Sequence, residues 1–369
     1  MSNDSKRMPR PIQYSEYLHL DKLLNAQHPE SARYGAPAHD ELLFIVVHQA
    51  YELWFKQIVH EFESVIDIFD NKTVEDKEMG QIIGWLSRVK TIQGLLLQQI
   101  DVLETMTPLD FLDFRDLLVP ASGFQSIQFK KIEIMMGIRR DQRISADKDF
   151  FKTRLTDAER AELLELESKP SLLELTDAWL ARMPFLQQGE YEFWKEYEQA
   201  VARMLDSDRY IIQNNTAISA ENREWQLAAI EATQKRFESL LDECQYESLR
   251  QQGEFRFSHR AFLAALFINL YRDEPMMYLP FRYLQLLLDI DQNFTAWRSR
   301  HALMVQRMLG RKIGTGGSSG YDYLNETTER NRVYLDLFSL STFLLPRSSL
   351  PELPDDLRRE LGFHFSSDQ

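Results

Sequence analysis

The sequence predicts an all-α fold, a large helical bundle with crossover connections. Two long spans contain no proline, residues 38–107 and 185–274, and helices favour such spans because proline interrupts their hydrogen bonds. Few windows alternate polar and apolar residues in the way that a half-buried strand does. Five of the 14 glycines fall between residues 310 and 320, which predicts one prominent loop in an otherwise helical chain.

The first helices follow from apolar spacing and from cap residues. Residues 1–13 are polar and are expected to be disordered, whereas residues 14–25 place Tyr and Leu on one face of a short amphipathic helix. Residues 26–38 contain two prolines and a glycine and are expected to form a loop. Asp40 can then cap a long helix that ends near Phe69.

A cap also marks the start of a short helix in the next segment. Thr107 is a suitable N-cap, Pro108 occupies the first helical position, and Asp110 brings negative charge to the first turn. This helix is expected to end before Pro120. On either side of it, apolar spacing predicts helices over residues 76–104 and 124–136.

The middle of the chain is more charged than its flanks but still carries helix signals. Two capping boxes, Thr156–Glu159 and Ser171–Glu174, each predict a helix start. We expect residues 14–369 to form a single all-helical domain, within which residues 140–255 are a more charged and more mobile section. Apolar spacing predicts the remaining helices over residues 186–206, 220–246, 258–272, 293–309 and 328–341.

Composition and charge exclude several classes of protein. The formal net charge is −14, with 43 Lys and Arg against 57 Asp and Glu, so neither nucleic-acid binding nor docking on anionic lipid is expected. Cys244 is the single cysteine, which excludes disulfide bonds within the chain and Cys-based zinc or iron–sulfur sites. No apolar stretch reaches about 18 residues, and no apolar signal core follows the N-terminus. We therefore expect a soluble cytoplasmic protein.

Two histidines lie on apolar faces of expected helices, and the first of them is His48. It shares a helix face with Phe44, Tyr51 and Phe55. The simpler interpretation is a core histidine whose ring nitrogens find a nearby polar partner, and the pattern alone favours it. The alternative is a histidine that faces a planar apolar ligand.

The second histidine is His301, in the helix expected over residues 293–309. A neutral imidazole on an apolar stripe is what haem iron needs as its proximal ligand, although periodicity alone again favours a core histidine. The apolar stripe also contains Trp297, Met304, Val305 and Met308. Haem propionates could be neutralised, or a solvated face formed, by Arg298, Arg300 and Arg307.

Two further segments could bind the polar end of a ligand. Phe111 and Arg115 lie one turn apart on the short helix, and Arg115 either forms a weak surface ion pair or faces inward to hold a carboxylate in a bidentate fork. Ser122 follows in a polar turn. The glycine-rich loop over residues 314–320 contains Thr315 and is either a linker or a flexible loop that folds over a small ligand.

Several other catalytic motifs do not occur in the sequence. The glycine-rich loop lacks the Gly-Lys-Ser/Thr ending of a P-loop, and no GxGxxG motif is found, so a mononucleotide site is a weak hypothesis. No H-E-x-x-H motif, no G-x-S-x-G motif and no repeated Glu-x-x-His pair is found. A zincin, an α/β-hydrolase and a di-iron bundle are therefore not expected.

Eight segments, which together span most of the chain, are similar to one known family. They are Tyr14–Asp21, His39–Lys56, Asp113–Asp116, Pro120–Phe129, Tyr271–Pro275, His301–Arg307, Gly314–Leu324 and Asp336–Thr342. In sequence and in order these segments resemble the tryptophan 2,3-dioxygenases. Any one segment alone would be weak support, but the set together is highly specific.

The resemblance implies an all-helical, homotetrameric enzyme that buries haem b between its helices. Such an enzyme uses ferrous haem and O2 to open the pyrrole ring of L-tryptophan. Both oxygen atoms enter across the indole C2–C3 bond, and the product is N-formyl-L-kynurenine. The reaction is the first step of tryptophan catabolism by the kynurenine route.

The resemblance also implies roles for individual residues. His301 resembles the proximal iron ligand, and His48 resembles the distal histidine that faces the indole N–H. Arg115 resembles the clamp for the substrate carboxylate and, with His48, is expected to serve catalysis. The other matches are Phe44 and Phe111 as walls of the indole pocket, Thr315 as a contact to the ammonium and carboxylate groups, Ser122 as a small polar group on the distal side of the haem, and Tyr14, Tyr17 and Leu18 as a segment inserted by a neighbouring subunit.

Two positions depart from the family pattern. Some bacterial relatives have a tyrosine where Phe111 stands, so one hydrogen bond to the carboxylate is missing here and Arg115 must contribute more. Many relatives have an arginine where Lys130 stands, and this difference tests nothing about the chemistry directly.

Two other functions are compatible with the residues. The first is a haem protein that binds or senses O2 or an indole compound without turnover, although a sensor needs no clamp for an amino acid. The second is a haem enzyme that acts on another indole or on a tyrosine-like compound.

Overall fold

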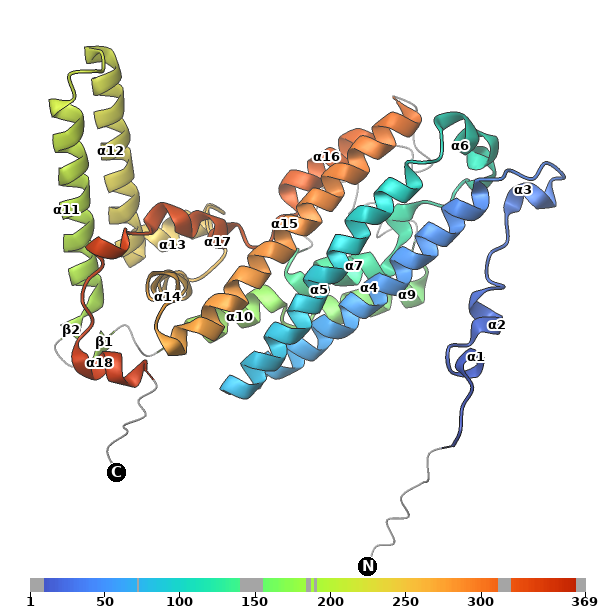
Figure 1. The fold of residues 1–369 in the computed structure, drawn as a ribbon, viewed down its shortest axis with the longest axis horizontal. Coiled ribbons are helices and arrows are strands. Elements are labelled where there is room, and N and C mark those ends of the chain that lie inside the picture. The colour runs from blue at the N-terminus through green and yellow to red at the C-terminus, as the bar shows by residue number, and fades with distance from the viewer. Residues whose placement is uncertain are drawn as a thin grey trace, which may run out of the picture.

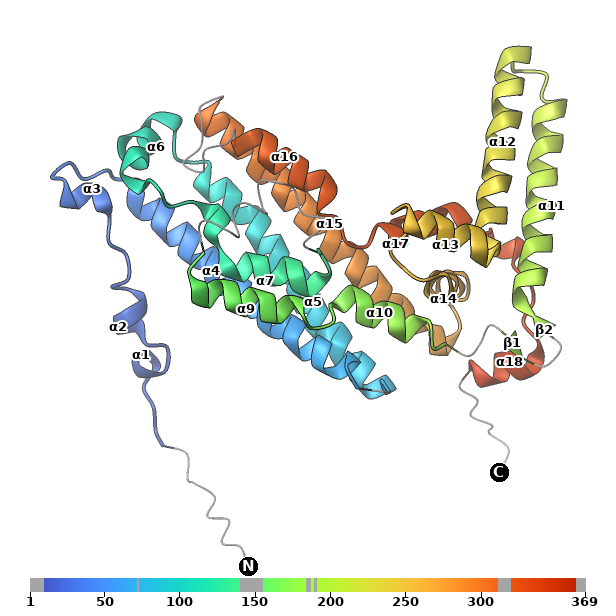
Figure 2. The same ribbon diagram turned by 180° about the vertical axis from the view of Figure 1, so that it is seen from behind.

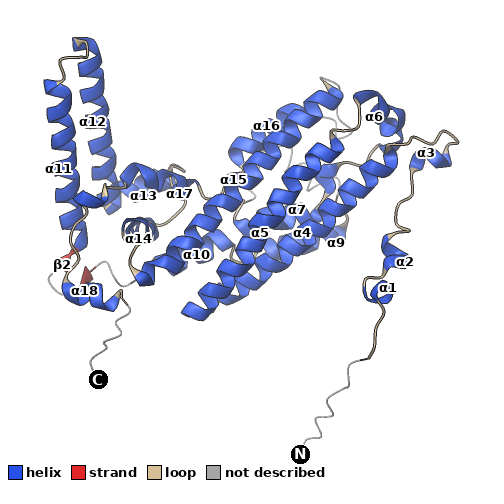
Figure 3. Ribbon diagram, in the orientation of Figure 1, coloured by secondary structure: helices blue, strands red, loops and turns tan. Residues whose placement is uncertain are grey.

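The computed structural model describes residues 10–71, 73–139, 155–183, 187–188, 191–310 and 320–362, and most of them are helical (Figure 3). The predicted all-α class is therefore confirmed. A short antiparallel pair, β1 (Gln187–Gln188) with β2 (Tyr191–Glu192), is the only strand structure among these residues. No helix in the described part of the chain is long and apolar enough to span a bilayer.

Three long helices form the centre of the fold. Helix α5 packs along both α4 and α15, α16 lies on α15, and α7 and α9 form a further layer against α4 (Figures 1 and 2). The facing surfaces of the long helices are fully buried, as at Phe62, Leu86 and Leu287. The bounds are α4 Glu41–Phe69, α5 Asp76–Leu103, α7 Ile127–Met136, α9 Asp157–Glu167, α15 Pro275–Leu309 and α16 Gly320–Arg330.

A second group of helices surrounds the N-terminal end of α15. Helix α14 packs against α10, α13 and α15, and α11 pairs with α12 in a hairpin that projects from the body of the molecule (Figures 1 and 2). The bounds are α10 Leu172–Leu180, α11 Phe193–Asn214, α12 Ala220–Leu241, α13 Glu243–Gln251, α14 His259–Leu270, α17 Leu335–Ser339 and α18 Asp355–Glu360. The shorter elements are α1 Tyr14–Tyr17, α2 Leu20–Leu23, α3 Glu30–Arg33 and α6 Pro108–Arg115, with 3-10 turns at Asp116–Leu118, Gly123–Gln125, Leu340–Phe343 and Arg347–Ser349.

Cap residues start three helices where the sequence predicted them. At α6, Thr107 Oγ1 accepts the N–H of Asp110 while the Asp110 carboxylate accepts the N–H of Thr107. The same reciprocal exchange opens α9 at Thr156 and α10 at Ser171. Helix α4 has the predicted extent, but Asp40 makes no side-chain hydrogen bond to it.

The N-terminal arm is less regular than predicted. A single helix over residues 14–25 is wrong, because His19 has a φ of 49° and separates α1 from α2. The expected loop contains α3, whose first turn is held by Glu41, since its carboxylate accepts the N–H groups of Glu30 and Ser31. The arm then extends away from the helical body (Figure 1).

Two helices in the more charged section also differ from the prediction. The helix expected over residues 186–206 starts later, at Phe193, because β1 and β2 precede it. The helix expected over residues 220–246 is broken at Asp242, whose carboxylate accepts the N–H of Gln245 and so caps α13.

The helix that carries His301 is longer than predicted, and the helix that follows is broken. Helix α15 begins at Pro275, about five turns before the expected start at residue 293, and contains Pro280 within its first turns. A continuous helix over residues 328–341 is wrong, because α16 ends at Arg330 and α17 starts at Leu335. The buried carboxylate of Asp291 accepts the N–H groups of residues 333 and 334, which holds this segment in a turn.

Candidate active site

A cavity of about 120 Å³ lies between α4, α5, α7, α15 and α16. His48 from α4 and His301 from α15 both line it, so the two predicted histidines are brought to one site. The apolar lining consists of Phe55, Ile100, Leu103, Phe129, Trp297, Met304 and Leu324. The space is therefore suited to a largely apolar group that contacts histidine from the wall.

His301 is a neutral imidazole whose Nδ1 atom has no hydrogen-bond partner in the described part of the chain. Burial and the nearby His48 lower its pKa to about 4, so the ring is uncharged at neutral pH. Its Nδ1 atom is buried and finds no partner among the residues that the structure describes. Trp297 stacks on the ring with a centroid distance of 5.3 Å and an interplanar angle of 9°. A core histidine satisfied by a polar neighbour is thus not what the described residues provide, and an imidazole nitrogen is free to bind a metal.

The two ring nitrogens of His48 have defined hydrogen-bonding roles, one as donor and one as acceptor. Its Nδ1 lies 2.7 Å from the carbonyl oxygen of Phe44, and because a carbonyl can only accept, Nδ1 carries the proton of the neutral ring. Burial lowers the pKa of His48, and the bond to Phe44 only partly offsets this effect. Nε2 is then left as a hydrogen-bond acceptor, which is the form needed to receive an N–H group.

An aromatic cluster joins α4 to α6 beside His48. The Phe44 ring lies 4.0 Å from the His48 ring, 5.7 Å from Phe111 and 5.6 Å from Phe114, measured between centroids. Phe114 is fully buried, whereas Phe44 and Phe111 are only partly buried. The two predicted walls, Phe44 and Phe111, are therefore adjacent, and Phe44 contacts the His48 ring, although neither phenylalanine lines the cavity itself.

Arg115 lies one turn after Phe111 and is mostly buried. Its side chain is 14% exposed, while the side chain of Asp116 is 86% exposed, and 3.4 Å separates Arg115 Nη1 from Asp116 Oδ1. A pair of this length with an exposed partner contributes about 0–1 kcal/mol. Asp110 instead belongs to the cap of α6. The ion pair with the exposed Asp116 therefore does not account for the burial of the Arg115 side chain.

Ser122 and the predicted site residues of the N-terminal arm do not line the cavity. The N–H of Ser122 donates to Gln125, and it is the neighbours Gly123 and Ser126 that line the cavity. The N-terminal arm extends away from the helical body (Figure 1), and none of its residues lines the cavity. The predicted loop residue Thr315 lies outside the described residues. The arm residues are all exposed, namely Tyr14, Tyr17 and Leu18.

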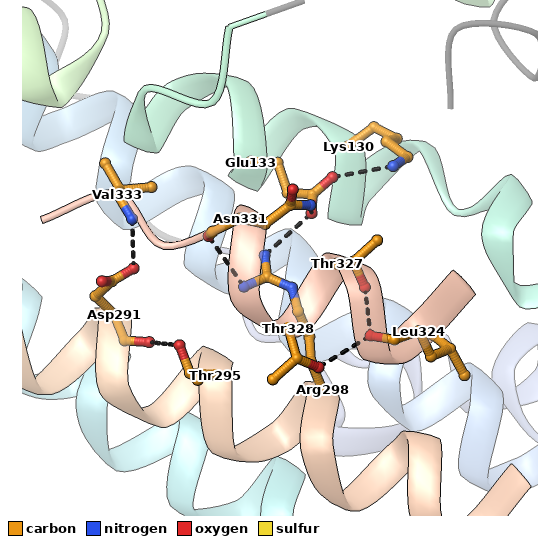
Figure 4. Close-up of polar contacts among 10 residues, drawn as sticks. All are labelled: Lys130, Glu133, Asp291, Thr295, Arg298, Leu324, Thr327, Thr328, Asn331 and Val333. Atoms are coloured by element: carbon orange, nitrogen blue, oxygen red, sulfur yellow. Dashed lines mark hydrogen bonds and ion pairs between the residues drawn. The ribbon is translucent and has the colours of Figure 1, made fainter. Parts of the chain in front are cut away.

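Several polar residues of the lining were not predicted as site residues, whereas Arg298 was considered as a partner of haem propionates or as part of a solvated face. Glu52 lies one turn after His48 on α4, and burial raises the pKa of its carboxyl group. Because Glu52 lies four residues after His48, helical spacing alone could have indicated that both side chains face the cavity. A buried cluster of Lys130, Glu133, Arg298 and Asn331 forms another part of the lining (Figure 4). Its members come from distant parts of the chain, so no local pattern could have revealed them.

Comparison with known proteins gives one consistent result. The family model described as tryptophan 2,3-dioxygenase matches residues 2–344. A tryptophan 2,3-dioxygenase of Alteromonas mediterranea is 52% identical over 97% of this chain and 99% of that protein. Proteins with the same name from Bdellovibrio bacteriovorus and Dictyostelium discoideum are 48% and 43% identical, over 96% and 99% of this chain and 99% and 92% of their own lengths.

Proposed function

The chain belongs to the tryptophan 2,3-dioxygenase family, and we propose that it oxidises L-tryptophan with O2 while haem b is bound in the cavity between α4 and α15. The proposed product is N-formyl-L-kynurenine, formed when both oxygen atoms enter across the indole C2–C3 bond. The observation that carries the proposal is the neutral imidazole of His301, whose Nδ1 has no partner among the described residues, in a cavity that it shares with His48.

The residues of the cavity fit a haem. His301 would bind the iron, because its lone pair is not taken by a proton or by a hydrogen bond within the described chain. Phe55, Phe129 and Met304 supply the apolar surface that a macrocycle needs. Ferrous haem, when bound, supplies the activation of O2 that amino-acid side chains cannot provide.

His48 would orient the substrate rather than remove a proton from it. The indole N–H is a very weak acid, and the pKa of His48 is lowered by burial, so the ring is a poor base. Its Nε2 can accept the indole N–H because Nδ1 donates to Phe44. This hydrogen bond fixes the position of the indole ring relative to the cavity, which is the contribution that proximity and orientation make to rate.

Arg115 would recognise the amino-acid end of the substrate. Burying a carboxylate without a charged partner is prohibitive, and a mostly buried guanidinium offers two aligned donors. Phe111 lies one turn before Arg115 on α6 and stacks on Phe44, and both rings would pack on the indole. Thr315 is proposed to contact the ammonium and carboxylate groups, and Ser122 to lie on the distal side of the haem.

We also propose that the active form is a homotetramer in which the N-terminal arm of one subunit completes the site of another. Large apolar side chains on this arm are unusually exposed, since Tyr14 is 75% and Tyr17 is 68% exposed. Leu18 lies between α1 and α2 and is exposed as well. A neighbouring subunit would cover these groups. We place the enzyme in the cytoplasm, at the first step of tryptophan catabolism by the kynurenine route.

The proposal is tested by product formation with haem-loaded, reduced protein in air. L-tryptophan, D-tryptophan and indole are supplied in parallel, and N-formylkynurenine or the corresponding indole product is measured. Product from L-tryptophan in preference to the others supports both the reaction and the role of Arg115. If haem and O2 are bound but no substrate is turned over, the protein is a haem-based sensor or binding protein instead. Turnover of a different indole alone would reassign the substrate.

A further inference from the structure

The buried cluster at the cavity lies one helical turn from the proposed iron ligand. Arg298 and His301 are three residues apart on α15, so their side chains leave the helix on the same side, and both line the cavity. Arg298 is 4% exposed and packs over the ring of Phe129, with 5.7 Å from its guanidinium carbon to the ring centroid. A displacement of the Arg298 side chain would therefore also displace the helical turn that carries His301.

Arg298 is held from two other parts of the chain. Its Nη2 donates to Glu133 Oε1 of α7 at 3.0 Å, and its Nη1 donates to the carbonyl oxygen of Asn331 at 3.3 Å (Figure 4). Asn331 Nδ2 donates to the same Glu133 oxygen at 3.0 Å, and Lys130 Nζ donates to the other at 3.0 Å. The carboxylate of Glu133 on α7 thus binds both α15 and the residue that follows α16.

A second set of hydrogen bonds connects α15 to the segment between α16 and α17. Asp291 lies two turns before Arg298 and accepts the N–H of Val333 at 2.9 Å and the N–H of Tyr334 at 3.3 Å. Asp291 and Asn331 are 0% and 2% exposed, so water cannot replace these bonds. Figure 4 shows Asp291 and Arg298 on one side of α15, both directed at the segment after α16. Helix α15 is therefore fixed against rotation and sliding along this side.

We propose that Arg298, held by Glu133 and Asn331, is a positioning residue that fixes the orientation of the His301 imidazole in the cavity. This inference rests on the proposed function, because it assumes that His301 binds haem iron. The reason is geometric. The Arg298 guanidinium lies 3.0 Å from the Glu133 carboxylate, and both side chains are buried, so the helix turn between Arg298 and His301 cannot move independently of α7 without breaking this ion pair.

Arg300 provides a matched control on the same helix. It lies between Arg298 and His301 in sequence but is 44% exposed, and it pairs with Asp101 of α5 and with Glu104, the residue after that helix. Of the two interpretations of Arg300, these pairs favour a solvated face over a partner of haem propionates. Loss of this exposed ion pair removes a positive charge near His301 without touching the buried cluster. An effect specific to the cluster should therefore be absent in Arg300→Gln.

The test compares the iron–histidine vibration of ferrous, haem-loaded wild type with that of Glu133→Gln, Arg298→Lys and Arg300→Gln, by resonance Raman spectroscopy. We expect the band to shift or broaden in Glu133→Gln and Arg298→Lys and to stay at the wild-type position in Arg300→Gln. Haem should also dissociate about 10- to 100-fold more readily from the first two variants, which is the usual effect of removing a group that orients a metal ligand. Unchanged bands in Glu133→Gln and Arg298→Lys would overturn the proposal, and so would an equal shift in Arg300→Gln.

Two further measurements separate this inference from its premise and from unfolding. If wild type itself gives no iron–histidine band, the proposed haem ligation fails, and the inference fails with it for that distinct reason. If Glu133→Gln does not fold, Asn331→Ala removes only one donor to Glu133, and its band should shift by less than that of Arg298→Lys. In the apo-protein, amide hydrogen exchange over the last two turns of α15 should quicken in Arg298→Lys but not in Arg300→Gln.

Discussion

Replacement of Arg115 by alanine should weaken recognition of L-tryptophan far more than recognition of ligands without a carboxylate. The Arg115 side chain is 14% exposed, so its bond to a carboxylate would form largely out of water. Truncating one partner of such a buried, hydrogen-bonded charge pair costs about 2–5 kcal/mol, which is a loss of about 30-fold to about 5,000-fold.

The assay is kcat/KM for L-tryptophan together with the binding of tryptamine, which keeps the indole and the ammonium group but has no carboxylate. Asp116→Ala is the matched control. Asp116 is 86% exposed and lies 3.4 Å from Arg115, so its removal should change kcat/KM by no more than the factor of about five that a surface ion pair allows. Equal losses for L-tryptophan and tryptamine in Arg115→Ala would refute the clamp, because the lost interaction would then not involve the carboxylate.

Three further predictions follow from the same site and from its supports. His48→Ala should keep haem but lower kcat/KM for L-tryptophan about tenfold, through loss of the acceptor for the indole N–H; loss of haem on purification would show that His48 is not distal. Phe111→Tyr should tighten L-tryptophan binding about two- to tenfold by adding a hydroxyl beside Arg115, and an unchanged dissociation constant in calorimetry would count against this placement. Burial raises the pKa of Asp336 from 3.8 to about 6, so the folded state binds this proton more tightly than the unfolded state. The resulting stability, about 3 kcal/mol, is present below about pH 4 and is lost as pH rises through about 6. The free energy of unfolding, measured in urea, should therefore decline between pH 4 and pH 6 in wild type but not in Asp336→Asn. Parallel pH profiles of the two proteins would contradict this prediction.

The sequence predicted those parts of the fold that depend on neighbouring residues. The capping boxes at Thr107, Thr156 and Ser171 start helices because the bonds involved span three residues. The facing positions of His48 and His301 were predicted from helical spacing and resemblance, and the cavity brings them together. The break between α16 and α17 could not be predicted in this way, because the carboxylate of Asp291 that holds it lies more than 40 residues earlier.

The candidate site shows the same division between local and distant contacts. Phe44 and His48, or Phe111 and Arg115, lie one turn apart, and their proximity follows from the helix alone. The pairing of Arg298 with Glu133 joins positions 165 residues apart and depends on how α7 meets α15. The arm with Tyr14 and Tyr17 is exposed in the single chain, so its proposed role depends on a second subunit.

The measurement that tests the central claim most directly is the absorption spectrum of the haem-loaded protein with and without His301. The account predicts that His301→Ala loses the spectrum of a histidine-ligated haem, and that added imidazole restores it by entering the space of the missing side chain. His301 is neutral and its Nδ1 has no partner in the described chain, so its removal takes away an imidazole nitrogen that is open to the iron. A variant spectrum identical to that of wild type, insensitive to imidazole, would contradict the assignment of His301 as the iron ligand.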